Sequence, residues 1–370
     1  MSIASDNMVR VSSKRLEQLV KNIFVGTGCS HTESDRIAYY LTKSNLSGHE
    51  SHGVLRVPRY LHWLKEGNLK MDQDITILNN NDSMSVVDGN KGFGQTIGPQ
   101  VVDLGIQKAK RSGLALVALR NSGHLGRIGD WGEMAAEEDV ISIHFVNTSG
   151  LGLLVAPFGG SQRRLSTNPF CIGIPRENGK SLILDFATSI VAEGKVLNAL
   201  GGGLSLPKNA LVDHDGTFSE DPSLIYGART GTQPLDQRTG SGAIRAMGEH
   251  KGSGLSFMCE LLAGALTGSG CSKEGIKELI NGMLSIYIVP KFLSENGAFY
   301  SELEEYVSYF LSSNVIEKDG TILCPGDAEQ NSRADRIKNG IPLTTSTWES
   351  LIKAAEDVGL SRAEIKSLSS

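Results

Sequence analysis

Cysteine is scarce in this chain, and its spacing argues against disulfide bonds and zinc ribbons. The 370 residues include 5 cysteines, an odd number, and no two of them stand as Cys-x-x-Cys. Disulfide-dependent secreted domains and zinc ribbons both need closely paired cysteines. The scattered thiols therefore favour a reducing compartment and give no indication of a metal site.

Long apolar runs and blocks of positive charge are also absent. No segment approaches the roughly 18 apolar residues of a membrane span, and the first residues lack the apolar core of a signal peptide. The net charge is −5, from 36 Lys and Arg against 41 Asp and Glu, with no basic stripe for nucleic acid. We therefore expect a cytoplasmic protein that binds a small molecule rather than a membrane or a nucleic acid.

The common nucleotide-binding and hydrolase motifs are missing as well. GFGQTIG, from Gly92 to Gly98, comes nearest to GxGxxG, but its last glycine stands one residue late. Gly173 precedes the GKS at residues 179–181 by one residue too many for a P-loop, and GxSxG does not occur. These absences argue against a Rossmann domain, a P-loop NTPase and an α/β-hydrolase.

The sequence does contain a helical pattern at both ends and an α/β pattern between them. Apolar residues recur at helical spacing over residues 13–26, 33–45 and 58–67, and again in a last helix that Thr345 or Thr347 can cap. In between, short β-branched runs such as SMSVVDG, LALVALRNS and ISIHFVNTS alternate with helical stretches. The pattern predicts the α/β (α+β) class.

Further patterns predict a mixed sheet and a division of the chain into parts. FCIGIP and SLILDFAT are strands about a turn at residues 177–180, KGSGLSFMCELLAGALTG is a buried helix, and GMLSIYIVP is a late central strand. The stretch 204–242, rich in Gly, Pro and Asp, predicts a long surface loop. We expect an N-terminal helical part over 1–82, an α/β domain over 83–310, and a C-terminal helical part over 311–370 that packs with the first.

Three histidines are candidates for acid–base chemistry. His49 and His52 lie in GHESHG just ahead of a predicted helix, and His124 follows a predicted strand in NSGHLGR. Two such imidazoles can flank one substrate. Each histidine can equally be a hydrogen-bonded turn residue, and zinc binding is a weaker alternative because no clear carboxylate partner accompanies them.

SHGVLRVPRY adds a cation to the same segment. If a helix begins near Ser51, then His52, Arg56 and Tyr60 share one face. A guanidinium matches a carboxylate, so this face could hold an organic acid with its reacting carbon near the imidazole. The alternative is a solvated face whose arginine pairs with a nearby glutamate, and Pro58 interrupts the helical hydrogen bonds.

Asp185 and Lys251 are further candidates for ligand contacts. Asp185 ends the apolar strand LILDFATS, where α/β proteins place ligand contacts, although a helix N-cap is the commoner role. Lys251 precedes a glycine-flanked helix start that suits phosphate binding, although it can also be an ordinary exposed lysine.

Taken in order, these segments resemble the type 2 malate/L-lactate dehydrogenase family, which does not share the Rossmann fold. The resemblance spans nearly the whole chain, and SIHFVN, EHKG and GIPL resemble the bacterial hydroxycarboxylate dehydrogenase B branch. The matching motifs are LSGHESHGVLRVPRY, GFGQ, NSGHLGRIGDW, VAPFGG, STNPFCIGIP, LDFATSIVAEGK, EHKGSGLSFMCELLAGALTG and CPGD.

The resemblance implies a homodimer and a set of catalytic residues. Each protomer would pair a helical domain from both chain ends with a mixed-sheet domain that binds NAD or NADP without GxGxxG. The histidine of SHG corresponds to His52 as the acid/base residue, and Arg56 and Tyr60 correspond to substrate contacts. His124 corresponds to a residue that some relatives use as the proton acceptor, and Asp185 joins the catalytic group.

The resemblance also implies the cofactor contacts. Gly48 and His49 replace an Arg-Gly-type pair common in the wider family, which bears on the substrate class. The implied cofactor is NAD, with NADP as the alternative, since no arginine cluster for a 2′-phosphate stands out. The implied contacts are Ser149, Asp185, Phe186, Ala187, Lys251, Ser285, Ile286 and Tyr287.

The sequence thus predicts an oxidoreductase that transfers a hydride between NAD(P)H and a 2-oxo acid, giving a 2-hydroxy acid of the malate, lactate or aryl-lactate type. One alternative within the family is a reductase of cyclic imino acids or diketo sugar acids. Another is a catalytically idle nucleotide-binding scaffold, and a zinc hydrolase built on His49, His52 and His124 is a more distant one.

Overall fold

The computed structural model describes residues 8–150, 152–177, 180–200, 205–227, 238–295 and 297–369. These residues form two compact units. The middle unit comprises Phe145–Phe170 and Phe186–Met283, and the terminal unit comprises Met8–His144, Cys171–Asp185 and Leu284–Ser370. The predicted domains over 1–82, 83–310 and 311–370 stay a prediction.

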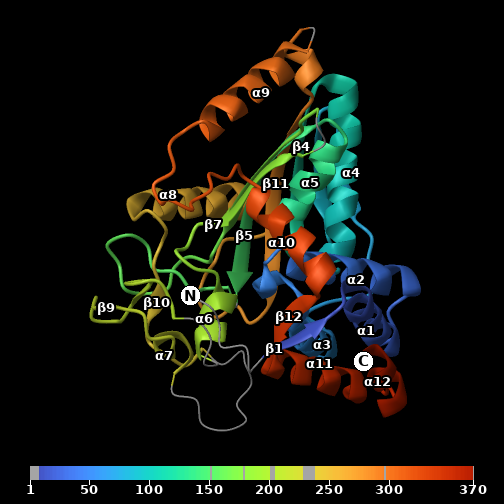
Figure 1. The fold of residues 1–370 in the computed structure, drawn as a ribbon. Coiled ribbons are helices and arrows are strands. Elements are labelled where there is room, and N and C mark those ends of the chain that lie inside the picture. The colour runs from blue at the N-terminus through green and yellow to red at the C-terminus, as the bar shows by residue number, and fades with distance from the viewer. Residues whose placement is uncertain are drawn as a thin grey trace. The chain divides into compact units, whose positions relative to one another are not determined.

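Helices from both chain ends pack together in the terminal unit, as the sequence predicted (Figure 1). Helix α1 contacts α2, α11 and α12, and α11 contacts α3. Strand β1 pairs antiparallel with β12 beside them. The elements are α1 (Ser13–Gly26), α2 (His31–Leu46), α3 (Val57–Lys65), α11 (Thr345–Asp357), α12 (Arg362–Ser369), β1 (Met8–Val11) and β12 (Ile341–Thr344).

The apolar spacing of α1 shows why this cluster forms. Leu16, Leu19, Val20 and Ile23 recur every three or four residues, so they lie on one face, and all are fully buried. Helix α11 is capped not by Thr345 or Thr347, as predicted, but by Thr344, whose hydroxyl accepts from the backbone N–H of Thr347.

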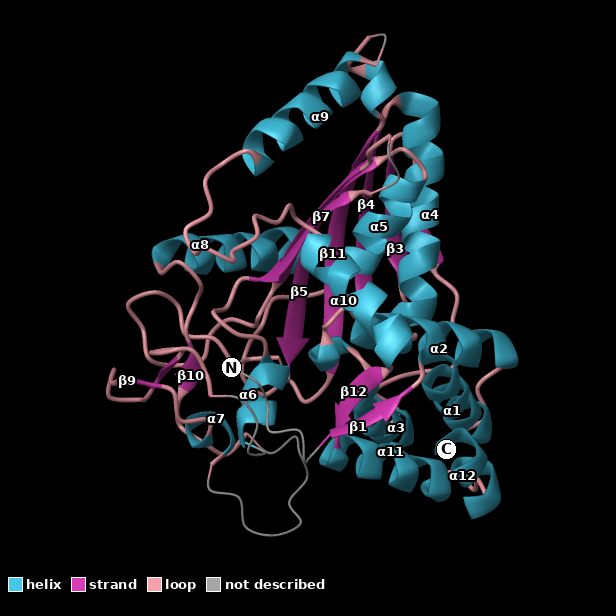
Figure 2. Ribbon diagram, in the orientation of Figure 1, coloured by secondary structure: helices cyan, strands magenta, loops and turns pink. Residues whose placement is uncertain are grey.

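The central element is a mixed seven-stranded sheet in the order β2-β3-β4-β11-β5-β6-β7 (Figure 2). Pairing is antiparallel between β2 and β3 and parallel between β3 and β4, which confirms the predicted mixed sheet. The late strand β11 is central, as predicted. The strands are β2 (Thr76–Asn80), β3 (Met84–Asp88), β4 (Leu114–Ser122), β5 (Ile141–Gly150), β6 (Pro169–Ile174), β7 (Leu182–Ala187) and β11 (Leu279–Ile288).

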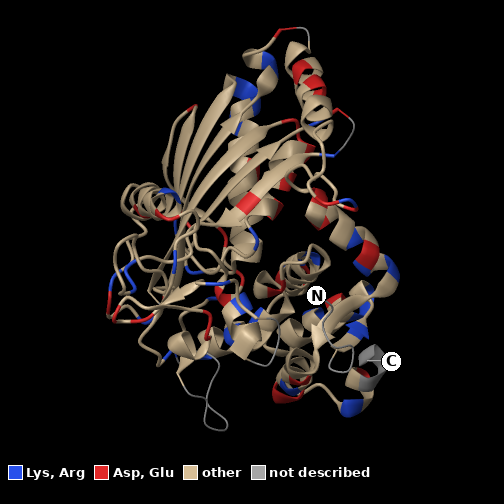
Figure 3. Ribbon diagram, turned by 60° about the vertical axis from the view of Figure 1, so that its left-hand side comes forward, with Lys and Arg blue, Asp and Glu red and all other residues tan. Residues whose placement is uncertain are grey.

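Helix α4 (Gly94–Ser112) packs closely on the sheet in the terminal unit. A Cβ atom at Gly105 would lie 2.1 Å from the Tyr287 ring of β11, so only glycine permits this approach. Helix α5 (Gly129–Glu137) contacts α4, and α10 (Asp327–Asn339) contacts α2. Helix α9 (Ala298–Leu311) carries acidic but no basic residues (Figure 3).

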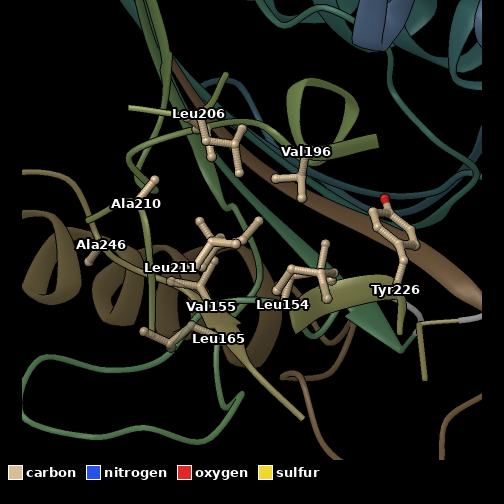
Figure 4. Close-up of a cluster of buried hydrophobic side chains, with 12 residues drawn as sticks. Leu154, Val155, Leu165, Val196, Leu206, Ala210, Leu211, Tyr226 and Ala246 are labelled. Carbon is tan, nitrogen blue, oxygen red and sulfur yellow. The ribbon is translucent and has the colours of Figure 1, made fainter. Parts of the chain in front are cut away.

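The middle unit has its own apolar core, formed by short elements (Figure 4). Its small sheet has the order β10-β8-β9. The core includes Leu154, Val155, Val196, Leu211 and Tyr226. The elements are α6 (Glu193–Leu200), β8 (Leu211–Val212), β9 (Phe218–Ser219), α7 (Ser223–Tyr226), β10 (Ala243–Ile244) and α8 (His250–Cys259), followed by a π-helical turn (Glu260–Ala265).

Two predictions for this unit were wrong. The stretch 204–242 is more than a surface loop, because it contains β8, β9 and α7 and buries Leu211 and Ile225; these elements are too short to give a periodic signal. Residue 204 and residues 228–237 of that stretch, like residues 178–179 of the predicted turn, lie outside the described residues.

The helix predicted to be buried is instead exposed on its apolar side. Phe257, Met258 and Leu266 of α8 and the following turns are each more than half exposed. The buried side of the helix carries small or polar residues, including Gly252, Ser256 and Glu260. The apolar content of the segment therefore wrongly predicted that the apolar side of this helix is buried.

Candidate functional site

The segment that carries His52 and Arg56 is irregular rather than helical. Glu50–His52 and Val54–Arg56 form two short 3₁₀ turns, and α3 begins only at Val57. Pro58 lacks an N–H and its ring disfavours helix on its N-terminal side, so the helix cannot extend back to Ser51. The predicted continuous helix over His52, Arg56 and Tyr60 was therefore wrong.

The side chain of Asn45 anchors the backbone between the two 3₁₀ turns. Its side-chain oxygen accepts from the backbone N–H of Val54 at 2.8 Å. A Cβ atom at Gly53 would lie 2.1 Å from the same oxygen, so the close approach requires glycine. This contact fixes the backbone on which His52 stands.

The structure brings His52 and His124 together although they are far apart in sequence. Their rings stack with centroids 5.3 Å apart and planes inclined by 5°. His124 lies in the turn after β4, as predicted, and is largely buried. Two imidazoles therefore share one site.

Tyr60 links this pair to Gln95 on α4. The amide Nε2 of Gln95 donates to Tyr60 Oη at 3.1 Å, and Tyr60 Oη lies 2.7 Å from His124 Nδ1. Burial raises the pKa of Tyr60 to about 12, which the nearby Arg56 partly opposes. The phenol is therefore neutral near pH 7 and donates to His124, so a neutral His124 carries its own proton on Nε2.

Arg56 lies beside this chain of hydrogen bonds. The residue is largely buried, with 8% of its surface exposed, and its Nε donates to Ser51 O at 2.6 Å. A buried cation near Tyr60, which hydrogen-bonds His124, is suited to binding a carboxylate.

Asp185 caps a different helix from the one expected. Its carboxylate accepts from the backbone N–H of Gly129, at the start of α5, at 2.7 Å. Burial raises the pKa of Asp185, and the charges of Arg127 and His49 oppose that rise. The helix start and the charge of Arg127 favour the ionised form, whereas burial disfavours it and is the largest of these effects.

Arg127 belongs to a buried ion network that sequence reasoning missed. Its Nη1 donates to Asp130 at 3.0 Å and to Glu133 at 2.9 Å. Lys43 and Arg333 bind the same Glu133, whose pKa falls to about 2 because of these three cations. The arginine stands three residues after His124 in NSGHLGR, and that position was the only available signal.

His49 is tied to α10 rather than stacked on the other histidines. Its Nε2 lies 3.0 Å from Glu329 Oε1, and this contact lowers the pKa of Glu329. His49 also lies near enough to Asp185 to lower the pKa of that carboxyl. It is thus placed beside the site, next to Asp185.

The predicted contacts on β11 lie mostly in the interior. Ser285 is fully buried and hydrogen-bonds His144 Nδ1 at 2.8 Å. Tyr287 is fully buried against Gly105 and the His144 ring. Burial alone lowers the pKa of His144 to about 3, so this histidine is neutral. A cofactor contact on this strand would therefore involve Ile286, which is half-buried, or the backbone.

The middle unit brings several of its predicted contacts close together. The N–H of Met247 donates to Thr188 O at 2.9 Å, so the segment after Phe186 and Ala187 meets the start of α8. Lys251 is exposed at that start, and the N-cap Glu249 makes no side-chain capping bond. Ser149, at the end of β5, is buried and donates to Ile280 O at 3.3 Å.

The histidine geometry bears on the zinc alternative. A histidine nitrogen binds a metal that lies in the plane of its ring. Because the His52 and His124 rings are stacked with nearly parallel planes, the two side chains cannot bind one ion together in this arrangement. Over the described ranges, no group of three or more His, Cys, Asp and Glu side chains has the arrangement to hold a metal ion.

In the same ranges, none of the helices is long and apolar enough to cross a membrane.

Comparison with known proteins identifies the family. The profile of malate/L-lactate dehydrogenases matches residues 11–352. Hydroxycarboxylate dehydrogenase B of Escherichia coli strain K12 is 33% identical over 95% of this chain and 95% of its own length. The chain therefore belongs to the malate/L-lactate dehydrogenase family, and the resemblance inferred from its motifs is confirmed.

Solved structures of similar proteins agree with this assignment. Malate dehydrogenase of Pyrococcus horikoshii OT3 has a TM-score of 0.84 and 28% identity, with 98% of this chain and 99% of that chain covered. The delta1-piperideine-2-carboxylate reductase of Pseudomonas syringae pvar. tomato has a TM-score of 0.79 and 30% identity, with 94% and 99% covered. The predicted non-Rossmann α/β fold is thereby confirmed.

Proposed function

We propose that this chain is an NAD(P)-dependent 2-hydroxycarboxylate dehydrogenase. It would interconvert a 2-oxo acid and the matching 2-hydroxy acid of the malate, lactate or aryl-lactate type. One observation carries the proposal: the stacked His52–His124 pair stands on the Tyr60–Gln95 chain, next to the buried Arg56. Family membership and the names of the relatives support it.

The stacked imidazoles suit the transfer of a single proton. Two positive charges 5.3 Å apart repel by about 3 kcal/mol at an effective dielectric constant of about 20. The pair therefore favours one proton at a time. In the reduction, His52 would donate that proton to the developing alkoxide. His124, which is fixed by Tyr60, and Asp185 would adjust how readily His52 gives up the proton.

Arg56 would bind the substrate carboxylate. Its Nε–H is fixed by Ser51 O, so the guanidinium plane is oriented before the substrate arrives. A bound carboxylate would bring the adjacent 2-oxo carbon close to the histidines, and this positioning would contribute to the rate alongside acid catalysis.

The middle unit fits a nucleotide phosphate at the start of α8. A Cβ atom at Gly252 would lie 2.2 Å from Met247 O and 2.9 Å from Thr188 O, so only glycine lets this helix start pack this closely on the DFATS segment. The N–H groups of Lys251 and Gly252 already donate to Gly248 O and Met247 O, so the exposed ammonium of Lys251 is the group proposed to bind the anion. When bound, the nicotinamide supplies the hydride.

The remaining cofactor contacts stay part of the proposal. They are Ser149, Asp185, Phe186, Ala187, Lys251, Ser285, Ile286 and Tyr287. We propose NAD as the cofactor, with NADP as the alternative, and a homodimer as the assembly. All five cysteines are free, which suits a reducing compartment, and we propose the cytoplasm.

The test is consumption of NADH and of NADPH with a panel of 2-oxo acids that includes pyruvate, oxaloacetate and phenylpyruvate. Oxidation with any 2-oxo acid supports the proposal and ranks both substrate and cofactor. Binding of NADH without oxidation across the panel would favour the idle scaffold instead.

A reductase of cyclic imino acids is the second candidate. The likeness to delta1-piperideine-2-carboxylate reductase favours it, because that protein is 30% identical across nearly the whole chain. The same acid, hydride donor and carboxylate clamp would serve a C=N bond. Faster turnover of a cyclic imino acid than of every 2-oxo acid would select this candidate. The diketo sugar acids belong in the same panel.

A further inference from the structure

A buried carboxylate in the middle unit makes contacts that neither the family motifs nor the proposed mechanism explains. Glu260 begins the π-helical turn after α8 and is 6% exposed. Single π turns inside helices are uncommon and often occur at functional sites. An ionised side chain in such a place needs several donors to offset the loss of water.

Glu260 receives those donors from three separate segments. Its Oε1 accepts from Asn168 Nδ2 at 2.9 Å and from Ser272 Oγ at 2.7 Å. Its Oε2 accepts from Asn147 Nδ2 at 3.2 Å and from the Ser272 backbone N–H at 2.9 Å. Asn147 is on β5, Asn168 precedes β6, and Ser272 precedes β11.

The first of these segments leads to Ser149, a proposed cofactor contact. Asn147 stands two residues before Ser149, and its side-chain oxygen accepts from Gly282 N–H at 3.2 Å. The intervening Thr148 is held at both its N–H and its O, because the N–H donates to Asn168 Oδ1 at 3.2 Å and the O lies 3.0 Å from Ser272 Oγ, whose single proton it shares with Glu260. Glu260 therefore anchors the backbone that presents Ser149.

The second segment leads to the DFATS turn. Asn168 is fully buried and has φ of +24°, a conformation that costs energy for a non-glycine residue. Its carbonyl accepts from Thr188 Oγ1 at 3.0 Å, and Thr188 follows Ala187 directly. The hydrogen bond from Asn168 to Glu260 helps to hold this strained residue in place.

Lys251 is connected to the same carboxylate through its helix. Glu260 follows directly after α8, and Lys251 is the second residue of that helix. One side chain thus joins the three segments of the middle unit that carry Ser149, Phe186 with Ala187, and Lys251.

We propose that Glu260 is a positioning residue for nicotinamide nucleotide binding, acting through Asn147, Asn168 and Ser272. The inference rests on the proposed function, since it concerns the nucleotide of that reaction. It predicts that Glu260 sets nucleotide affinity and leaves the substrate step largely unchanged.

The test is Glu260→Gln, because the amide keeps the shape but replaces one acceptor with a donor. The new amide NH₂ would take the place of Oε1, facing Asn168 Nδ2, or of Oε2, facing Asn147 Nδ2. Both asparagine nitrogens are donors, so at least one buried hydrogen bond is lost in either case. Titration of NADH and NADPH by fluorescence should show Kd about tenfold higher or more. KM for the nucleotide should rise in parallel, while kcat at saturating nucleotide and KM for the 2-oxo acid stay within about twofold.

Glu193→Gln is the matched control. Glu193 is a similarly buried carboxylate of the same unit, but it binds Arg238 and Tyr226 rather than the three segments. The same substitution there should leave nucleotide Kd unchanged even if it lowers the melting temperature. An equal rise in Kd for both variants would show a general loss of stability and would overturn the proposal.

Ser272→Ala keeps the test decisive if Glu260→Gln does not fold. It removes the one hydroxyl proton that Glu260 Oε1 and Thr148 O share, so nucleotide Kd should rise by a few fold with kcat retained. Unchanged Kd in a folded Glu260→Gln or Ser272→Ala protein overturns the inference alone. A wild-type protein that binds neither nucleotide overturns the proposed function, and the inference with it.

Discussion

At the scale of the residue, the site depends on two histidines that the chain brings together from separate segments. His52 stands on a short 3₁₀ turn and His124 follows a strand, yet their rings are parallel and in contact. The hydrogen bond from Tyr60 fixes only His124. The two imidazoles therefore have different surroundings, which is what unequal roles in proton transfer require.

Substitution of His52 tests its assigned role. His52→Ala should lower kcat by about a hundredfold or more, because general acid catalysis typically contributes about 10²- to 10⁴-fold. The Kd for the nucleotide should stay the same, because the proposed nucleotide contacts do not include His52. Steady-state kinetics and fluorescence titration measure the two quantities.

His62→Ala is the control for this substitution. His62 lies on α3 of the same unit, and its side chain is 55% exposed beside Glu66. It should keep the wild-type kcat. A His52→Ala protein with normal turnover and weakened nucleotide binding would contradict the assignment.

Tyr60 provides a second test at this scale. Burial raises its pKa to about 12, so the hydroxyl stays protonated and can donate to His124 throughout the neutral range. Tyr60→Phe removes that bond, and kcat should fall by about tenfold, the equivalent of one charge-assisted or buried hydrogen bond.

Tyr40→Phe serves for comparison in the same assay. Burial also raises the pKa of Tyr40 to about 12, but its ring packs against Trp131, outside the Gln95–Tyr60–His124 chain. Equal losses of activity in the two variants would argue that losing any buried phenol hydroxyl lowers kcat, and that the bond from Tyr60 to His124 has no specific role.

At the scale of the element, Glu133 on α5 joins segments from three helices. It binds Lys43 of α2, Arg333 of α10 and Arg127, just ahead of α5. These cations lower its pKa from 4.5 to about 2. A carboxyl group whose pKa is lowered in the folded state stabilises the fold at pH values above its ordinary pKa of 4.5. This stabilisation is lost as the pH falls from 4.5 towards 2.

Glu133→Gln should therefore destabilise the protein most at neutral pH. Removing one partner of a buried ion network costs about 3–5 kcal/mol. The difference in unfolding free energy from the wild type should be large near pH 7 and should shrink as the pH falls below 4.5. Urea unfolding at several pH values measures it, and a difference independent of pH would count against the network.

The contact between α4 and β11 is also tested at this scale. Gly105→Ala would place a methyl group 2.1 Å from the Tyr287 ring, and overpacking of this kind costs about 1–3 kcal/mol. Gly254→Ala in α8 meets nothing within 4 Å and should raise stability by about 0.5–1 kcal/mol. Thermal unfolding measures the stability of both variants. An unchanged stability of Gly105→Ala would show that α4 and β11 can move apart at little cost.

Elements with a strong periodic pattern could be predicted from the sequence. The bounds of α1 follow from its apolar stripe, and β3, β4, β5 and β11 follow from their β-branched runs. The pattern failed where another force decides the structure. Pro58 and Asn45 break the helix around His52, and the polar Glu260 side of α8, rather than its apolar side, faces inward.

At the scale of the whole molecule, the family could be predicted, but much of the site could not. Spacing places His52 and Arg56 in one segment, whereas the stack on His124 depends on the packing of α3 against the turn after β4. Arg127, Gln95 and Glu260 lie within the matching motifs, but their tertiary contacts could not be predicted from local sequence. The family resemblance implies cofactor contacts at Ser285 and Tyr287, yet their side chains lie in the interior.

The most direct measurement for the central claim is the fate of the transferred hydrogen. The protein would be incubated with reduced nicotinamide nucleotide that carries deuterium at both C4 positions and with pyruvate, oxaloacetate or phenylpyruvate, and the product would be analysed by mass spectrometry. The account predicts a 2-hydroxy acid with deuterium bonded to C2, formed by the wild type and strongly reduced in His52→Ala. A 2-hydroxy acid without deuterium at C2, or no product from any of these acids, would contradict it.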